Sequence, residues 1–573
     1  MFRSSEWFAG DDEVALMHRV ALRTTGVEIS ASESRPVIGI ANSASGLNPC
    51  NLPLAALSRD VARGIRDAGG IPMEFPVMSL GEDLMKPTAM LYRNLLAMEV
   101  EEYLRSYPLD GVVLLANCDK SVPGAVMGAV SAGLPTVVLT AGARPIARFR
   151  GRRVGTGTEL WRTWEDHRAG RLDDAGWSEF EECLSCGLGA CNTMGTASSM
   201  AIVTEALGLA LPGTSTIPAA DESRVDAAYE TGRRAVSMVL EDFRPEKVLT
   251  PDGFKNAARV LNAIGGSTNV VLHLLAIAGR AGVEFRADDV DRFGRGVPVL
   301  ADVEPSGRLL IQDFHDAGGL PQLLARLGSL IETSALTATG RPWASEIPPP
   351  SGVGDGAIRS LSNPLSVDGA FAVVRGSLAP HGAILKTSAA SGALFQHVGP
   401  ALVFRSYEEM RSRIDDPGLD VSPDTVLVLS GAGPVGVPGM PEWGMIPIPA
   451  KLAALGVSDM VRITDSRMSG TSFGTCLLHV APEAAVGGPI GLVRDGDMVS
   501  LDVAGRHLDL LVDSAEMQAR AARWSPSASA HLRGWPALYR NHVTQADQGC
   551  DLDFLQAPTP AHRRFVPPTV GRS

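Results

Sequence analysis

The stretch Asp110-Gly-Val-Val-Leu-Leu-Ala116 runs directly into Asn117-Cys118-Asp119-Lys120 and then into Ser121-Val-Pro-Gly124. Its apolar, β-branched first part predicts a buried strand, and the small residues of 122–132 predict a helix. A thiol, a carboxylate and an amine therefore stand where a strand ends and a helix begins. Ligands of open α/β sheets bind at the carboxyl ends of strands, so residues 117–120 are the first candidate for a reaction centre.

The same alternation of apolar runs and helical segments extends to both sides of this stretch. Strands are predicted over 36–41, 71–75 and 134–140, and helices over 54–68 and 87–104. The strand, helix and strand of residues 110–140 form a βαβ unit, which implies parallel pairing. The sequence therefore predicts an N-terminal α/β/α region with a largely parallel sheet.

The pattern becomes strand-like after residues 340–365, a segment rich in Pro, Ser and Gly that we interpret as a linker. Seven short β-branched runs follow, at 370–374, 401–404, 425–429, 460–463, 490–493, 498–503 and 508–512. They predict a β-rich C-terminal domain that resembles a barrel. We thus expect an α/β fold of two domains, residues 1–365 and 366–573, ending in a tail from residue 557.

Two further segments interrupt the predicted N-terminal domain. Residues 144–182 are rich in Arg and acidic residues, contain three tryptophans, and are interpreted as a surface excursion. A predicted helix over 254–278 is broken by Gly265-Gly-Ser-Thr-Asn269, which would expose backbone groups.

Length, charge and cysteine content narrow the class of protein. A chain of 573 residues is too long for one core, and its net charge of −13 argues against a nucleic-acid-binding surface. No run approaches eighteen apolar residues and the N-terminus lacks a secretory pattern, so we expect a cytoplasmic protein without a membrane partner. Seven cysteines, an odd number, favour ligand or core roles over a disulfide framework.

Three cysteines occupy separate polar turns beside predicted strands or helices: Cys50, Cys118 and Cys191. Any one of them could be a small buried hydrophobic residue. Three thiolates that converge at one end of a sheet would instead suit an iron–sulfur cluster or zinc. Cys183-x-x-Cys186, with Cys191 five residues later, also resembles part of a local metal knuckle, although that motif is incomplete.

Oxygen and amine groups surround the same region. Glu82 and Asp83 precede a helix and could complement its dipole, but with Asp119 they also offer the ligands that Mg²⁺ prefers. Lys120 could be a surface amine, a base or a target for carbamylation. Farther along, the Gly–Pro loop of 431–444 carries Glu442, and Ser469 follows a predicted strand, either as a helix cap or as a base.

Taken together, these motifs identify the chain as resembling the dihydroxy-acid dehydratase and phosphogluconate dehydratase family. The resemblance covers nearly the whole chain and rests on Asn48-Pro-Cys50-Asn, residues 81–94, Asn117 to Gly124, Cys191 to Ser199, Gly265 to Asn269, Pro438 to Glu442 and Asp465-Ser-Arg-Met-Ser469-Gly. Trp443 to Pro447 and His542 to Phe554 resemble the sugar-acid (aldonate) branch of the family.

The resemblance implies a hydro-lyase that dehydrates a sugar acid to a 2-keto-3-deoxy acid. It implies a [2Fe–2S] cluster, or a [4Fe–4S] cluster, held by Cys50, Cys118 and Cys191. It further implies Mg²⁺ held by Glu82, Asp119, Glu442 and a carbamylated Lys120, with Ser469 as the base. The family forms homodimers or homotetramers, so the same is expected here.

One position departs from the family pattern, and two other functions stay open. The family has His three residues after the first cysteine, where this chain has Pro53, so substrate choice or tuning of the cluster is in question. The alternative within the family is a dihydroxy-acid dehydratase of branched-chain amino-acid synthesis. The alternative of another class is a non-catalytic iron–sulfur or zinc binding protein.

Overall fold

The N-terminal half is built on a parallel sheet of four strands in the order β2-β1-β3-β4. The computed structural model describes residues 2–32, 35–168, 170–350, 356–525 and 533–556. The four strands are β1 (Val37–Asn42), β2 (Ile71–Pro76), β3 (Gly111–Leu115) and β4 (Thr136–Leu139). Every residue of β1, β3 and β4 is buried, as expected for a parallel sheet covered on both faces. The predicted strands and their parallel pairing are confirmed.

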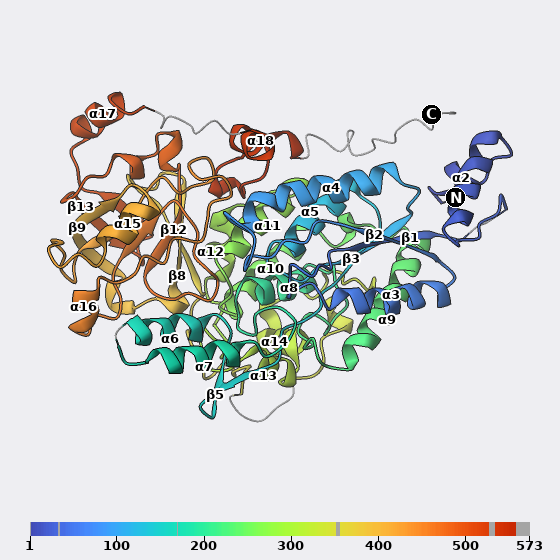
Figure 1. Cartoon of the computed structure of the whole chain (residues 1–573), viewed down its shortest axis with the longest axis horizontal. Helices are drawn as coiled ribbons and strands as arrows, with labels where there is room; N and C mark the ends of the chain where they lie inside the picture. The colour runs from blue at the N-terminus through green and yellow to red at the C-terminus, as the bar shows by residue number, and fades with distance from the viewer. Residues whose placement is uncertain (1, 33–34, 169, 351–355, 526–532, 557–573) are drawn as a thin grey trace.

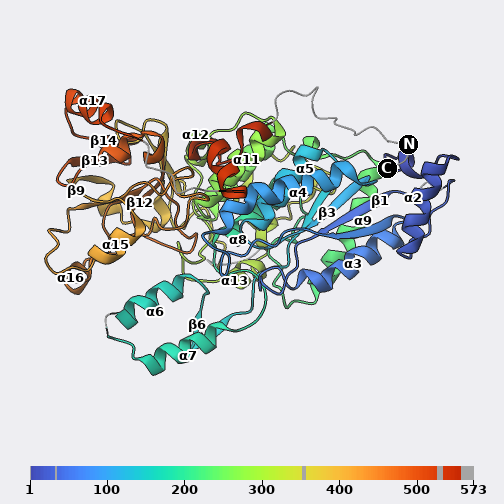
Figure 2. The ribbon, with the colours of Figure 1, turned by 45° about the horizontal axis from the view of Figure 1, so that its top comes forward.

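Helices cover the two faces of this sheet (Figures 1 and 2). One layer pairs α3 (Leu54–Asp67) with α9 (Ser223–Leu240), and the other pairs α4 (Arg93–Ser106) with α5 (Ser121–Ala132). The contact between α3 and α9 requires glycine: a Cβ at Gly64 would lie 2.0 Å from the carbonyl oxygen of Tyr229, and one at Gly232 would lie 2.2 Å from that of Val61. The two backbones can approach this closely only without side chains at these positions.

Further helices pack beside this layered core. The predicted break at residues 265–269 is confirmed, since it separates α10 (Pro251–Ala263) from α11 (Asn269–Ala281). Apart from the two helices of residues 158–184, the other α-helices in the described part of this half are α1 (Ser5–Phe8), α2 (Glu13–Thr24), α8 (Thr196–Ala206), α12 (Ala287–Gly294), α13 (Ile311–Asp316) and α14 (Gly319–Leu327).

The predicted surface excursion is a hairpin of strands followed by a pair of helices. It contains β5 (Ala147–Phe149), β6 (Arg152–Val154), α6 (Thr158–Arg168) and α7 (Asp174–Leu184). The two helices project from the body of the molecule (Figure 2). Trp164 and Trp177 contact each other, with ring centroids 5.4 Å apart, and hold α6 against α7.

The C-terminal half is a sheet of eight strands in the order β14-β13-β9-β10-β11-β12-β8-β7. The strands are β7 (Phe371–Val374), β8 (Gly382–Lys386), β9 (Gln396–Phe404), β10 (Val426–Leu429), β11 (Arg462–Thr464), β12 (Cys476–Ala481), β13 (Met498–Asp502) and β14 (His507–Leu510). A bridge between Arg375 and His507 joins the two edges, so the sheet is a nearly closed barrel. Three pairings in the middle, from β9 to β12, are parallel, and the outer pairings are antiparallel.

The barrel differs from the sequence prediction in three places. The predicted strand at 490–493 is a 3-10 turn, Pro489–Leu492, because Pro489 cannot donate a ladder hydrogen bond and glycines flank it. Strands β8 and β12 were not predicted, since their runs are apolar without being rich in β-branched residues. Outside the barrel strands lie α15 (Tyr407–Arg413), α16 (Ala450–Ala454) and α17 (Ser514–Ala522).

The last described segment returns to the N-terminal half. It contains α18 (Trp535–His542) and then a turn in which the carbonyls of Gly549 and Cys550 each accept a 2.8 Å hydrogen bond from Arg93. Asp551 pairs with Arg280 of α11 at 2.6 Å. Both arginines are wholly or almost wholly buried, so these contacts fasten the end of the chain to α4 and α11.

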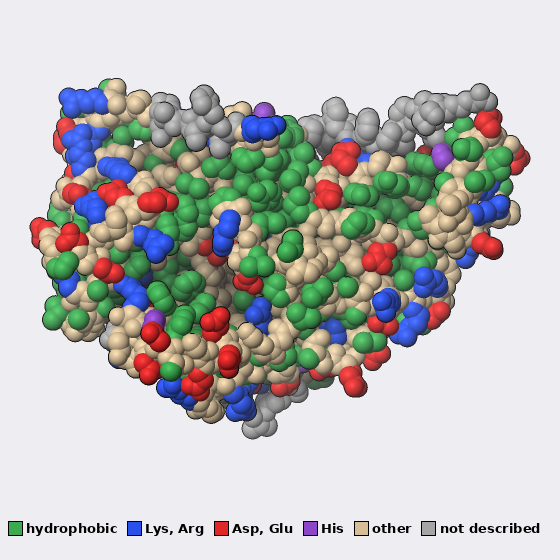
Figure 3. Space-filling view, in the orientation of Figure 1, with side chains coloured by type: hydrophobic (Ala, Val, Ile, Leu, Met, Phe, Trp, Pro, Cys, Tyr) green, Lys and Arg blue, Asp and Glu red, His purple; other side chains and the backbone are tan. Residues whose placement is uncertain are grey.

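No helix in the described ranges is long and apolar enough to cross a membrane. Acidic and basic side chains are interspersed over the face seen in Figure 3. The boundary between residues 365 and 366 stays a prediction, and the tail from residue 557 and part of the linker, 351–355, lie outside the described residues.

Candidate functional site

The turn at residues 117–120 connects the carboxyl end of β3 to α5, as predicted. The side chain of Asn117 ties neighbouring loops together: its Nδ2 donates to the carbonyls of Cys50 (2.8 Å) and Gly142 (3.0 Å). The amide N–H of Cys118 donates to Oδ1 of Asn51 at 2.8 Å. The loop after β1, which carries Cys50, is thereby fixed beside the loop after β3.

The three predicted cysteine ligands lie together. They line a cavity of about 250 Å³ whose wall also contains Glu82, Asp119, Glu442 and Ser469. The hydrogen bond with Cys50, together with burial, raises the pKa of the Cys118 thiol well above its usual range. Burial and the neighbouring Cys50 raise the pKa of Cys191 to about 12. Three sulfurs this close would need a cationic group between them to carry charge as thiolates.

Cys183 and Cys186 do not join this cavity. They pack at the end of α7 in a small apolar cluster that includes Phe149 and Phe180. The Cys186 thiol donates to the carbonyl of Pro145 at 3.1 Å. The geometry therefore does not bring the Cys-x-x-Cys pair and Cys191 together into a local knuckle.

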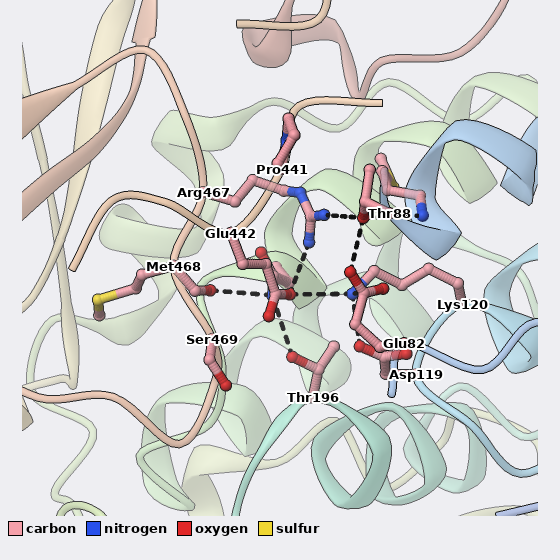
Figure 4. A network of polar contacts seen from close by, with 12 residues as sticks. Glu82, Thr88, Asp119, Lys120, Thr196, Pro441, Glu442, Arg467, Met468 and Ser469 are labelled. Atoms are coloured by element: carbon pink, nitrogen blue, oxygen red, sulfur yellow. Dashed lines mark hydrogen bonds and ion pairs between the residues drawn. The ribbon is translucent and has the colours of Figure 1, made fainter. Parts of the chain in front are cut away.

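Lys120 lies among three carboxylates that come from both halves of the molecule (Figure 4). Its Nζ is 3.0 Å from Oε1 of Glu442 and 3.6 Å from Oε2 of Glu82, and it also pairs with Asp119. Burial alone would lower the pKa of Lys120, but the three carboxylates raise it above its usual value. Within the described ranges, no three His, Cys, Asp or Glu side chains stand in a metal-binding arrangement. The ammonium group, a cation, lies where these acids converge.

The donor set nevertheless fits the two groups that the sequence implies. Three carboxylates already gather around one positive charge, and carboxylate oxygen is the preferred ligand of Mg²⁺. Replacing the ammonium with a carbamate would change a competing cation into a fourth acidic ligand. The three sulfurs on the adjoining wall form a separate, softer donor set suited to iron.

Arg467 and Asn269 hold Glu442 in place. Nη1 of Arg467 lies 2.7 Å from Oε1 of Glu442, and its Nη2 donates to Thr88 Oγ1 at 3.0 Å. Thr88 in turn donates to Oε1 of Glu82 at 2.6 Å. Asn269, the first residue after the break between α10 and α11, donates to Glu442 Oε1 at 2.8 Å. The break therefore supplies a side chain to the site.

Two buried acids fix the Gly–Pro loop that carries Glu442. Asp465 accepts from the N–H groups of Gly431 (3.0 Å) and Ala432 (2.9 Å). Glu483 accepts hydrogen bonds from the backbone N–H groups of Val435 (2.9 Å) and Gly436 (2.8 Å). Burial, and then the charge of Asp465, raise the pKa of Glu483 to about 7.

The Gly–Pro loop follows β10 and Ser469 follows β11, so both leave the carboxyl ends of neighbouring parallel strands.

Ser469 lies on the turn next to Glu442 (Figure 4) and lines the same cavity. Its Oγ is 2.9 Å from Oγ1 of Thr471. Trp161, from the excursion helix α6, donates from Nε1 to the same Thr471 oxygen at 3.1 Å. The excursion therefore reaches back into the site.

Sequence reasoning missed several residues of this cavity. Arg144, Leu160 and Trp161 belong to the segment interpreted as a surface excursion, yet all three line the cavity wall. The only available signal was the gathering of tryptophans and arginines in a polar segment, and that signal is not specific. Arg467, in contrast, lies within the motif of residues 465–470, but the sequence alone did not indicate its role in the site.

A buried polar cavity at strand ends, with sulfur and carboxylate groups beside a serine, defines an enzyme assembled from an α/β half and a barrel half. Sequence profiles described as dihydroxy-acid/6-phosphogluconate dehydratase, N-terminal and C-terminal, match residues 35–346 and 356–550. The chain belongs to this family and is a dehydratase.

Curated relatives align along nearly the whole chain. A 6-deoxy-6-sulfo-D-gluconate dehydratase of Pseudomonas putida is 47% identical over 97% of this chain and 96% of its own length. An L-arabinonate dehydratase of Rhizobium leguminosarum bv. trifolii is 46% identical over the same shares. A dihydroxy-acid dehydratase of Ignicoccus hospitalis is 38% identical over 94% of this chain and 98% of its own length. The non-catalytic alternative is therefore set aside.

Proposed function

We propose that this protein dehydrates a sugar acid to a 2-keto-3-deoxy acid with an iron–sulfur cluster and Mg²⁺. The observation that carries the proposal is that Cys50, Cys118 and Cys191 share one cavity with the carboxylates and with Ser469. The sugar-acid substrate is supported by relatives of that specificity at 46–47% identity, against 38% for a dihydroxy-acid dehydratase.

The cysteines would hold the cluster, and Glu82, Asp119, Glu442 and a carbamylated Lys120 would hold Mg²⁺. When bound, these groups would supply Lewis acidity at the C3 hydroxyl and at the carboxylate and C2 hydroxyl of the substrate. Three cysteines leave one ligand position of a four-ligand cluster open. We propose [2Fe–2S], with [4Fe–4S] as the alternative.

Ser469 would act as the base. Its Oγ would take the proton from C2, the C3–O bond would break with loss of hydroxide, and the resulting enol would become the 2-keto acid. A free serine hydroxyl is far too weak an acid to be ionised at neutral pH, so a cation bound nearby would have to lower its pKa. Thr471, at 2.9 Å, would orient the Ser469 oxygen.

We also propose a cytoplasmic homodimer or homotetramer with domains at residues 1–365 and 366–573. Seven cysteines without a disulfide are consistent with a reducing compartment. The mass in solution, measured by light scattering after size exclusion, tests the assembly.

The test of function is anaerobic purification, metal and sulfide analysis, and a panel of pentonates and hexonates with detection of the keto acid. The panel includes 2,3-dihydroxyisovalerate, the substrate expected of a branched-chain enzyme. We expect iron, sulfide and Mg²⁺ in the protein and turnover of sugar acids. Turnover of the branched acid alone would reverse the assignment, and zinc without iron and sulfide would overturn the cluster.

A further inference from the structure

Arg144 is a cation held rigidly in the wall of the site cavity. It lies between β4 and β5, and its backbone N–H donates to the carbonyl of Ala190 at 2.8 Å. Its Nε donates to the carbonyl of Gly189 at 3.2 Å. A Cβ at Gly189 would lie 2.7 Å from the Arg144 backbone nitrogen, so glycine permits this close approach. The side chain is therefore anchored at Nε, while of its two terminal nitrogens Nη2 makes one long contact with the Cys50 sulfur.

Those terminal nitrogens lack an acidic partner. Nη2 is 4.0 Å from the sulfur of Cys50, and the described residues give this guanidinium no ion pair with a carboxylate. Asp83 lines the same cavity; burial would lower the pKa of Arg144, but the neighbouring Cys191, Cys50 and Asp83 raise it. A partly buried cation without a paired anion costs free energy unless something negative binds there.

The cavity does not end at Arg144. A neighbouring pocket of about 550 Å³ shares Arg144, Leu160 and Leu184 with the site cavity. Its other walls are mainly apolar and include Pro49 and Trp177, the latter from the projecting helix α7 (Figure 2), together with one acid, Glu181. Space for a longer ligand therefore runs from the cysteines, past the guanidinium, and under the excursion.

Arg144 stands where the site cavity meets this neighbouring pocket, on the side toward which the tail of the substrate would extend. This step rests on the proposed function, in which C1 and C2 face the carboxylates and Ser469 while C3 faces the cysteines. Carbons beyond C3 then extend past the cysteines, where the guanidinium is exposed to the cavity. We propose that Arg144 binds an anionic group at the far end of the substrate, so that the preferred substrate is a sugar acid with two anionic ends. The second anion is a sulfonate, a phosphate or a carboxylate, each of which a guanidinium fork can bind through two hydrogen bonds.

The competing explanation is that Arg144 only offsets the negative charge of the cysteine thiolates. In that case its removal would weaken the cluster and lower turnover of every substrate by the same factor. If it binds the substrate tail, its removal would change the ratio between dianionic and monoanionic substrates. The two explanations therefore differ in a measurable ratio.

The experiment compares wild-type holoenzyme with Arg144→Gln and Arg144→Lys. Each is assayed on D-gluconate and on three matched dianions: 6-deoxy-6-sulfo-D-gluconate, 6-phospho-D-gluconate and D-glucarate. The same comparison is made between D-galactonate and galactarate. Arg148→Gln, at an exposed position of β5, is the matched control. Iron, sulfide and the visible spectrum are recorded for every variant.

We expect wild type to have a higher kcat/KM for at least one dianion than for its monoanionic parent. Arg144→Gln should reduce that preference by about 10- to 100-fold, as expected for loss of a hydrogen bond to a charged group. Arg144→Lys should retain part of the preference, and Arg148→Gln all of it.

Three outcomes would contradict the inference or its premise, and they are distinguishable. A wild-type preference for the monoanions would overturn the inference alone. Equal losses on both substrate types in Arg144→Gln, accompanied by loss of iron, would assign Arg144 to the cluster instead. Absence of turnover on every sugar acid, with the cluster intact, would overturn the proposed function itself.

Discussion

The ammonium nitrogen of Lys120 lies 3.0 Å from Oε1 of Glu442, although 322 positions separate the two residues in the chain. Lys120 is the N-cap residue of α5 in the α/β half, whereas Glu442 lies on a loop of the barrel half. The acidic part of the site therefore exists only when the two halves are packed together. Any change that separates them should abolish it before it affects the cysteine loops, which all lie in the first half.

Glu442→Gln tests this shared position. The amide keeps the size of the side chain but removes one of the three charges around Lys120. We expect weaker Mg²⁺ binding and a fall in kcat/KM of at least about 100-fold, as for loss of a metal ligand. The Mg²⁺ dependence of activity measures this, with exposed Glu408→Gln as the control. Unchanged Mg²⁺ dependence would contradict the assignment.

Ser469→Ala tests the proposed base. General base catalysis contributes about 10²- to 10⁴-fold, so we expect a loss of at least that order in kcat. Iron, sulfide and Mg²⁺ contents should equal those of wild type because the serine is not among the proposed ligands. Thr471→Val should show a smaller loss, since the partners of its hydroxyl among the described residues are the Ser469 oxygen and Trp161. Near-normal turnover in Ser469→Ala would refute the role.

Cys191→Ala tests the cysteine set, and Cys186→Ala is its matched control. Both side chains are partly exposed and only five residues apart, but Cys191 alone lines the site cavity. We expect Cys191→Ala to lose iron, sulfide and the visible spectrum of the cluster, while Cys186→Ala retains all three. Loss of iron in the control variant instead would point to the Cys-x-x-Cys pair.

Lys386→Met tests a buried charge away from the proposed ligands. Lys386 ends β8, is 1% exposed, and its Nζ has no hydrogen-bond partner among the described residues. Burial lowers its pKa to about 7. Between pH 7 and the ordinary lysine value near 10.5, the folded chain binds fewer protons than the unfolded chain, so stability rises with pH across this window. Below pH 7 the full penalty of charging the buried amine is present.

Methionine removes that penalty. We expect Lys386→Met to raise the free energy of unfolding by about 4 to 5 kcal/mol at pH 6, and by about 1 kcal/mol at pH 10. Thermal unfolding at the two pH values measures the difference, with exposed Lys247→Met as the control. A destabilised variant at pH 6 would show that the amine makes a favourable contact.

The sequence predicted the parts of the molecule in which local pattern and tertiary role agree. The strand before Asn117 is buried on both faces, so its sequence is an uninterrupted apolar run. The break before Asn269 is marked by paired glycines. Most site candidates of the motifs, among them Cys50, Cys118, Glu442 and Ser469, line one cavity because they follow strand ends, whereas Cys191 follows helix α7. Their chemical roles stay predictions.

Other features depend on contacts between distant segments, which local pattern does not encode. Strand β12, Cys476–Ala481, is defined by its pairing with β11 and β8 rather than by β-branched residues. Arg144 and Trp161 belong to a polar segment whose composition indicates solvent, but the segment folds back so that Trp161 meets Thr471, 310 positions later. No period or propensity could have placed them in the site.

The contacts of Arg93 and Arg280 with residues 549–551 also set an order of assembly during synthesis. A ribosome produces the chain from its N-terminus, so the three cysteine loops can form long before the barrel is made. The two arginines, both buried in the finished protein, have partners earlier in the chain, but their contacts with residues 549–551 form only after almost the last described residues are made. A nascent chain could therefore present its thiols early, while closure of the acidic site and sealing of α4 and α11 come only at the end of translation.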